Sequence, residues 1–411
     1  MLAPQAAWAA GFQINEHSAL NTGMASSVVA TVDDASAVFH NPAGLTSIEG
    51  TEFQVGSNLI VPHGRYTGPG LPGTGGTGPD GQELVNDPVP VPYVYAARAL
   101  SDKAFIGLGF YLPYGSGLEW RNADEFVGRT QLRDLALRTF YFTPSVALKL
   151  NDMISVAVGV SLVPATLLLR QEVGATDTQE PLFPQGSLAE ISATAFGVGA
   201  NAGIQLTLID HLKIGFVYKS AVDLSFSGEV NFTVPEDAPL EVRASFPDQT
   251  GNGDITLPHS FGLGLGWEQG PLTAEIGAQL TLWESYEELR LNFDTGLPAP
   301  SQASPKDWEN VFLFRLGLEY RIGDLALRAG GGYDVSPIPQ TTADFTLPDN
   351  DRIFYSLGVG YDFGVVRADI GYMGLWLQER ELTSDNVNIP AGGTFNGGFA
   401  HVASLSFGIS I

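Results

Sequence analysis

Few residues in this chain have the types and spacing that catalysis requires. The six histidines are scattered over 411 residues, and no HExxH or GxSxG motif accompanies them. Neighbours in an extended strand point to opposite faces, so His259 cannot meet Ser260, and the same parity separates His401 from Ser404. The chain has no cysteine, which excludes disulfides, thiolate metal sites and a cysteine nucleophile. We therefore expect no enzyme, no cofactor and no metal site.

The residues with useful chemistry are isolated charges opposite apolar faces. Five such charges are Arg170, Arg315, Arg328, Arg367 and Asp369. A carboxylate that leaves water needs a cation or hydrogen-bond donors. Arg170 and Arg328 are therefore candidates for binding an acidic headgroup. The alternative is that these arginines pair with acids, such as Asp349 and Asp351, and brace the fold.

The elements that carry these charges alternate with the period of a β-strand. The best charge-free candidate for a membrane span, 191–209, places Phe196, Val198 and Ile204 on one face and glycine, Asn201 and Gln205 on the other. This alternation argues against a membrane-spanning helix, which needs about 20 mainly apolar residues. The same pattern recurs at 212–219, 272–282, 312–320, 353–363 and 399–411.

Three features favour a membrane barrel over a soluble sandwich. The polar face is rich in glycine and serine, which suits a crowded lumen. Many apolar faces end in an aromatic residue, as interfacial girdles do: Tyr218, Trp267, Tyr320, Tyr333, Tyr361 and Trp376. Tight turns at 151–152, 210–211, 269–270, 323–324 and 363–364 alternate with long loops at 62–90, 115–138, 172–188, 229–254, 294–308, 336–351 and 379–398. Charged residues make up only 16%, against roughly 25% in soluble domains.

Counting these segments predicts an all-β fold, a transmembrane antiparallel β-barrel of about 14 strands. Residues 11–50 do not alternate and are rich in alanine and serine, so we expect a partly helical hatch that plugs the lumen. Ala7 and Ala9 fit a signal-peptidase pattern. The expected organisation is a signal-peptide remnant at 1–9, a hatch at 10–50 and a barrel at 51–411; the alternative for 1–9 is an uncleaved tail.

The sequence resembles the FadL-type transporters of long-chain fatty acids and hydrophobic compounds in the Gram-negative outer membrane. The resemblance covers most of the chain, and its motifs occur in the family's order. They are 10–16 (AGFQINE), 33–35 with 41–45 (DDA and NPAGL), 256–260 (TLPHS), 283–291 (WESYEELRL), 327–330 (LRAG), 336–339 (SPIP) and 347–352 (LPDNDR). One departure is the last residue, Ile411, where barrels of this kind usually end on an aromatic residue.

The resemblance implies roles for particular residues. Phe12 contributes to an apolar site inside the barrel, or else only packs in the hatch. The hatch residues are Gly11, Asn41 and Pro42; Asn41 and Pro42 form a ligand-responsive hinge, or else only a turn, which Asn-Pro signals first. A kinked third strand, 104–113, opens the wall sideways through Gly107, Gly109 and Pro113, or else simply ends at the proline. The ligand-binding candidates are Phe12, Arg170, Arg328, Asp349, Asp351 and Arg352.

The resemblance also implies passive uptake of long-chain fatty acids or related hydrophobic compounds. The loops at 112–118 and 126–137 would capture the ligand, unless they are merely solvated. The expected partners are the hydrophobic ligand and outer-membrane lipid, with the protein as a monomer. Nucleic acid is excluded, because a net charge of −25 repels phosphate backbones. The alternatives are a porin-like diffusion channel, an aromatic hydrocarbon channel or an adhesive barrel.

Overall fold

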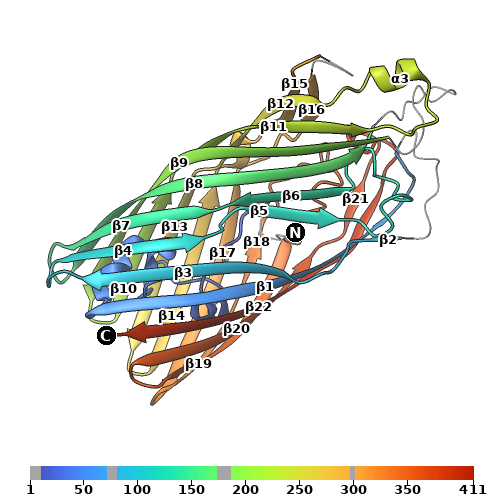
Figure 1. Ribbon diagram of the computed structural model, residues 1–411. Coiled ribbons are helices and arrows are strands. Elements are labelled where there is room, and N and C mark those ends of the chain that lie inside the picture. The colour runs from blue at the N-terminus through green and yellow to red at the C-terminus, as the bar shows by residue number, and fades with distance from the viewer. Residues whose placement is uncertain (1–10, 72–80, 174–186, 297–300) are drawn as a thin grey trace.

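The computed structural model describes residues 11–71, 81–173, 187–296 and 301–411. The expected signal-peptide remnant at 1–9 lies outside these residues. The strands form a closed antiparallel barrel of 14 strands, as the alternation predicted (Figure 1). Because several strands are interrupted, the 14 strands comprise 22 segments of one sheet.

The segments and helices have the following bounds. Six barrel strands are single segments: β1 (Thr51–Thr67), β8 (Ile154–Glu172), β9 (Leu188–Ile209), β18 (Leu325–Asp334), β19 (Arg352–Asp362) and β22 (Gly393–Ser410). Eight are pairs: β2 (Gln82–Glu83) with β3 (Val89–Ala99), β4 (Ala104–Tyr111) with β5 (Gly115–Glu119), β6 (Asp134–Thr139) with β7 (Tyr141–Lys149), β10 (Leu212–Lys219) with β11 (Val222–Thr233), β12 (Gln249–Leu257) with β13 (Ser260–Gln269), β14 (Leu272–Thr281) with β15 (Glu288–Phe293), β16 (Ser301–Pro305) with β17 (Val311–Ile322), and β20 (Val366–Leu377) with β21 (Arg380–Leu382). The helices are α1 (Ala19–Gly23), α2 (Ala37–His40), α3 (Leu240–Ala244), η1 (Pro42–Ser47) and η2 (Trp283–Ser285).

The outer face of the barrel is apolar and the inner face is small or polar. On β19, Ile353 and Leu357 are 56% and 58% exposed, whereas Ser356 between them is 1% exposed. A row of exposed apolar side chains with buried small residues between them is the pattern of a wall that meets lipid outside. Among the described residues, no helix is long and apolar enough to span a bilayer.

The connections divide the barrel into two rims. Tight turns join β7 to β8, β9 to β10, β13 to β14, β17 to β18 and β19 to β20, at the positions predicted from the sequence. Long connections lie at the other rim, where α3 is found (Figure 1). Short periplasmic turns and long extracellular loops are typical of bacterial outer-membrane barrels.

Several strands break at the same height. Lys219 at the end of β10 is in register with Ser260 at the start of β13, Ser260 with Thr281 at the end of β14, and Thr281 with Val311 at the start of β17. The interruptions that follow or precede these residues therefore lie side by side. We call this row of interruptions on four neighbouring strands the break belt. It is the level at which loop residues can turn into the lumen.

Residues 11–50 fill the lumen on the short-turn side of the break belt. The helices α1, α2 and η1 lie inside the ring of strands (Figure 1). One side of this hatch, α1, contacts β18, β19, β20 and β22, and the other side, η1, contacts β7, β8 and β9. The hatch is therefore packed against opposite walls.

Candidate functional site

Phe12 lies at the centre of an aromatic cluster at the break belt. The phenyl ring is 5% exposed, and its centroid is 4.8 Å from that of Trp283, 5.6 Å from Trp308, 5.8 Å from Tyr286 and 6.2 Å from Tyr114. The four partners come from interruptions between β4 and β5, β14 and β15, and β16 and β17. The rings that surround Phe12 thus come from the places where the strands are interrupted.

Gly11 fits this cluster because it has no side chain. Its φ of +66° is in the left-handed region, and an added Cβ would lie 2.5 Å from the Trp308 ring and 2.9 Å from Trp283. A side chain at Gly11 would therefore clash and also strain the backbone. This glycine allows the chain to enter between the two indoles.

A mainly apolar pocket opens beside Phe12. Its walls are mainly apolar and come from both hatch and barrel, among them Phe12, Leu135, Leu137, Leu167, Leu169, Ile255, Leu289, Trp308, Ile338 and Leu347. A second, smaller pocket shares Leu167, Ile255 and Leu289 with it. Mainly apolar walls with a few polar groups are typical of small-molecule sites.

One ion pair lies in the wall of the larger cavity. Lys306 is 3% exposed as a side chain and Asp344 is 6% exposed. The Lys306 ammonium donates to the Asp344 carboxylate and, at 3.1 Å, to the hydroxyl of Thr346. Burial raises the pKa of the neighbouring Tyr286 hydroxyl, so this wall residue is neutral. The cavity therefore combines a long apolar surface with one localised charge pair, which suits an amphipathic molecule.

The hatch entrance is hydrogen-bonded to the kink of the third strand. The Ile14 N–H donates to the Pro113 carbonyl at 2.7 Å, and the Gly115 N–H donates to the Phe12 carbonyl at 2.9 Å. Pro113 lies in the interruption between β4 and β5, where the sequence predicted a kink. Residues 12–14 thus act as a short extra strand on the edge of the third barrel strand.

The wall loses its ladder next to this kink. The β3–β4 pairing runs from Ala99 with Phe105 to Val94 with Phe110. Beyond it, β3 continues to Val89 with β1 as its partner, and among the described residues no pairing joins this part of β3 to β4 or β5. The structure therefore has a gap in backbone pairing between the second and third strands.

Gly107 and Gly109 face the hatch rather than the gap. A Cβ on Gly107 would lie 2.6 Å from the Val38 side chain, and one on Gly109 would lie 2.9 Å from Val38 and from Tyr111. Both glycines make room for α2. Their part in opening the wall stays a prediction, because the packing shown is that of the closed hatch.

Gly11, Asp349 and Arg352 come together near the start of the hatch. The Gly11 N–H donates to Asp349 Oδ2 at 3.3 Å, and the fully buried Arg352 lies 3.6 Å from Asp349 and 3.4 Å from Asp334. Asp351 is joined to this group through Ser336, whose N–H donates to Asp351 at 3.0 Å and whose hydroxyl donates to Asp349 at 2.9 Å; Asp351 also accepts the Tyr333 hydroxyl at 2.6 Å. These charges hold the 336–351 loop against the hatch, which is the bracing alternative of the sequence analysis.

Asn41 and Pro42 form a turn and also attach the hatch to the wall. The Asn41 side chain accepts from Ala43 N at 3.1 Å and so caps η1, whose first residue is Pro42. Its amide group donates to the carbonyls of Val29 at 2.7 Å and Ile204 at 3.2 Å. Ile204 belongs to β9. The turn interpretation of this motif describes the geometry, whereas its role as a ligand-responsive hinge stays a prediction.

Neither Arg170 nor Arg328 is a free cation that could bind a ligand headgroup, because both already pair with carboxylates. The expectation that Arg170 faces the lumen is wrong: its side chain is 44% exposed and pairs with Glu190 at 2.6 Å and Asp134 at 3.5 Å. The lumen-facing neighbours are Leu167 and Leu169, which line the cavity. Three consecutive leucines, 167–169, hide the phase of the alternation, which explains the error.

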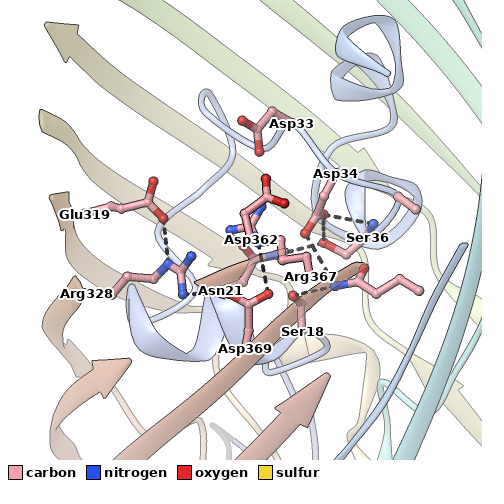
Figure 2. Close-up of polar contacts among 12 residues, drawn as sticks. Ser18, Asn21, Asp33, Asp34, Ser36, Glu319, Arg328, Asp362, Arg367 and Asp369 are labelled. Carbon is pink, nitrogen blue, oxygen red and sulfur yellow. Dashed lines mark hydrogen bonds and ion pairs between the residues drawn. The ribbon is translucent and has the colours of Figure 1, made fainter. Parts of the chain in front are cut away.

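Arg328 lies behind α1 in a network of charges (Figure 2). Its fully buried guanidinium pairs with Glu319 at 2.6 Å and Asp369 at 2.8 Å, and Arg367 pairs with Asp369 at 3.1 Å. On the hatch side of the same network, Asp34 accepts from Ser36 N at 3.0 Å. Because both carboxylates already neutralise Arg328, this arginine braces the seat of the hatch.

A single wall carboxylate holds the hatch turn 29–31. Glu275 of β14 accepts from the backbone N–H of Val29 at 2.5 Å, Ala30 at 3.0 Å and Thr31 at 2.9 Å, and from the Thr31 hydroxyl at 2.8 Å. Every contact donates into the carboxylate. Among the described residues, no other wall side chain accepts as many hatch bonds.

The whole chain matches one family. A family model described as "Outer membrane protein transport protein (OMPP1/FadL/TodX)" matches residues 1–409. The chain belongs to this family. As a member of the OMPP1/FadL/TodX family with a closed 14-strand barrel, it is an outer-membrane protein.

Relatives in the OMPP1/FadL/TodX family include transport proteins. The long-chain fatty acid transport protein of Salmonella typhi is 26% identical over 390 residues, covering 89% of this chain and 87% of that protein. Outer membrane protein P1 of Haemophilus influenzae is 27% identical over 414 residues, covering 90% and 87%.

Solved structures share the fold. A Pseudomonas aeruginosa FadL homologue has a TM-score of 0.83 at 22% identity and covers 98% of this chain and 100% of its own. The P. putida toluene transporter TodX has a TM-score of 0.72 at 16% identity, covering 97% and 99%. These similarities confirm the barrel predicted from the alternation.

Part of the cavity wall and of the aromatic cluster around Phe12 was not predicted from the sequence. Lys306, Trp308 and Tyr286 were not named as site residues, and Trp283 was noted only within a family motif. Their one common signal is position: each lies where an alternating segment stops. The signal is weak, because a sequence does not show which interruptions share a height in the barrel.

Proposed function

We propose that this protein takes up long-chain fatty acids or related hydrophobic compounds passively, without chemistry of its own. The observation that carries the proposal is the mainly apolar pocket at Phe12, with one buried ion pair in its wall, beside a gap in the backbone pairing. A continuously wet pore would offer no comparable apolar site. The names of the fatty acid and toluene transporters among the relatives support the same class of ligand.

The proposed path begins at the loops and ends in the bilayer. The ligand is captured at the long-loop rim, occupies the Phe12 cavity beside Lys306, and leaves through the gap between β3 and the β4–β5 kink. Lateral exit has a physical reason, because hydrating an alkyl chain costs about 0.8 kcal/mol per CH₂. In this proposal residues 10–50 are the hatch, residues 51–411 the barrel, and residues 1–9 a signal-peptide remnant.

The paired contacts of residues 12–14 couple the cavity to the gap. A ligand that displaces Phe12 also pulls on the Phe12 carbonyl and the Ile14 N–H, which bond Gly115 and Pro113. Occupancy would thus release the hatch from the third strand. Gly11, which carries the chain into the cluster, moves with it.

The test is equilibrium binding of a radiolabelled long-chain fatty acid to the purified protein in detergent. Saturable binding that unlabelled fatty acid displaces and a sugar does not is the expected result. Displacement by toluene alone, with no fatty acid binding, would assign the cavity to hydrocarbons. Absence of any apolar binding, with a large steady conductance in planar bilayers, would replace the proposal with a porin.

Two variants locate the site. Phe12→Ala removes one wall of the cavity. Burial of an apolar side chain of this size contributes about 1.5–3 kcal/mol, so its loss predicts roughly tenfold weaker ligand binding or more. Phe216→Ala is the matched control, because Phe216 is 39% exposed on the outer face of β10. Equal affinities for the two variants would place the ligand elsewhere.

A further inference from the structure

Lys219 is a lumen cation with no acid beside it. It is the last residue of β10, and its Nζ lies 3.4 Å from the centroid of the Phe39 ring of the hatch. Within the described part of the chain, no carboxylate lies within ion-pair distance of Lys219, and its ammonium has no hydrogen-bond acceptor. Among the other buried cations, Arg328, Arg352 and Lys306 pair with carboxylates, whereas Arg315 donates to the Ser26 carbonyl and to the Gln279 side chain.

This arrangement is costly unless something else approaches the ammonium. A charge removed from water needs a counter-charge or several hydrogen bonds, and a cation–π contact supplies only a fraction of that. Lys219 nevertheless keeps part of its surface open, because its burial is intermediate rather than complete. An anion can therefore reach it from within the lumen.

The register places Lys219 close to the Phe12 cavity. Lys219 is paired with Ser260, and Ser260 with Thr281. The Thr281 hydroxyl donates at 3.4 Å to Gln13, the residue after Phe12. Two strand spacings of about 4.8 Å put Lys219 roughly 10 Å along the wall from this hatch contact.

Lys219 also lies on the way to the wall gap. The Phe39 ring beneath its ammonium packs 5.1 Å from Tyr111, the last residue of β4. Phe39 further contacts His17 at 4.3 Å, and His17 contacts Tyr93 of β3 at 6.4 Å. This layer of rings extends from Lys219 to both strands that border the gap.

The hatch histidines do not supply a competing positive charge. Burial, followed by the charge of Lys219, lowers the pKa of His17 to about 3. The same two causes lower the pKa of His40 well below its usual range. Both rings are neutral at pH 7. Arg315, a wall residue whose charge also contributes to the low pKa of His40, already donates to the Ser26 carbonyl at 2.8 Å and to Gln279.

We propose that Lys219 is a second anion-binding point, which receives the carboxylate of an amphipathic ligand between the Phe12 cavity and the wall gap. This inference rests on the proposed function and narrows its substrate class to acids with a long apolar chain. Lys306, whose ammonium has a third N–H besides those donated to Asp344 and Thr346, receives the headgroup while the ligand fills the cavity. Lys219 then accepts it as the chain turns toward β3 and β4, so the carboxylate is never without a cation.

The test compares an acid with its neutral analogue. Initial uptake rates of a radiolabelled long-chain fatty acid and of its methyl ester are measured in cells that lack other transporters of this family. The variants are Lys219→Met and Lys219→Arg, with Lys213→Met as matched control. Lys213 is on the same strand and face, but pairs with Glu268 at 2.8 Å at the short-turn rim.

We expect Lys219→Met to lower acid uptake by at least about tenfold relative to ester uptake, because a hydrogen bond to a charged group is lost. Lys219→Arg should restore the ratio, and Lys213→Met should leave it unchanged. Fatty acid affinity of the purified protein should also stay unchanged in Lys219→Met, since Lys306 still holds the headgroup.

The outcomes separate the two proposals. An acid-to-ester ratio in Lys219→Met equal to that of the wild type overturns the role of Lys219 and leaves the transport proposal standing. An equal fall for acid and ester also overturns it, because that result reports damage to the barrel or hatch. A wild type that takes up neither compound overturns the transport proposal itself.

Discussion

Removing the Glu275 carboxylate should release the hatch turn 29–31 without unfolding the barrel. Glu275→Ala deletes the acceptor of three backbone N–H groups and one hydroxyl. At the lower end of about 1.5–3 kcal/mol per bond to a charged group, the three backbone bonds alone amount to roughly 4.5 kcal/mol. That corresponds to an increase on the order of a thousandfold in the local opening equilibrium.

Hydrogen–deuterium exchange with mass spectrometry measures this opening directly. Peptides that cover Val29 to Thr31 should exchange about three orders of magnitude faster in Glu275→Ala, whereas barrel strands should keep their protection. Glu275→Gln keeps one acceptor oxygen and should give an intermediate rate. Glu268→Ala, on the neighbouring strand β13, is the control. Unchanged protection of the turn in Glu275→Ala would refute the view that this carboxylate holds the hatch.

Three further perturbations test other contacts. Gly109→Val should displace Val38 and loosen the hatch, seen as a higher single-channel conductance in planar bilayers; wild-type conductance would contradict this. Lys306→Met should weaken fatty acid binding about tenfold but not toluene binding, measured by competition, and an equal loss of both would contradict the headgroup role. The pKa of His17 is depressed to about 3 in the folded hatch, against about 6.5 in the unfolded chain. The free energy of unfolding of the hatch is therefore highest above pH 6.5 and falls by about 2 kcal/mol when the pH is lowered to 5. Hydrogen exchange of the hatch between pH 5 and 7 should show this slope, and His17→Phe should reduce it; an equal slope in both would contradict it.

The barrel could be predicted because its physics is local. Period-two alternation such as that of 353–363 needs only neighbouring residues, and lipid outside with a packed lumen inside produces it in every strand. The tight turns could be predicted for the same reason, because they too depend only on neighbouring residues. Where alternation was absent, at 11–50, the sequence correctly indicated short helices.

The candidate site could be predicted only in part, because it is assembled from distant segments. Phe12 was named through the family resemblance, but its partners Trp283 and Trp308 meet it only because their strands break at one height. The face of Arg170 was misassigned because the leucines before it erase the phase of the alternation. The role of Glu275 could not be predicted, since no local feature of the sequence shows that a hatch turn lies opposite this carboxylate.

The closing seam of the barrel has a consequence for assembly. The first strand, β1, pairs with the last, β22, from Glu52 with Ser410 to Thr67 with Thr394. The hatch precedes β1 and touches walls on both sides of the lumen, so the seam closes the wall around it. We infer that the hatch acts as a template around which the wall gathers, and that a chain without it would have to close around an empty lumen.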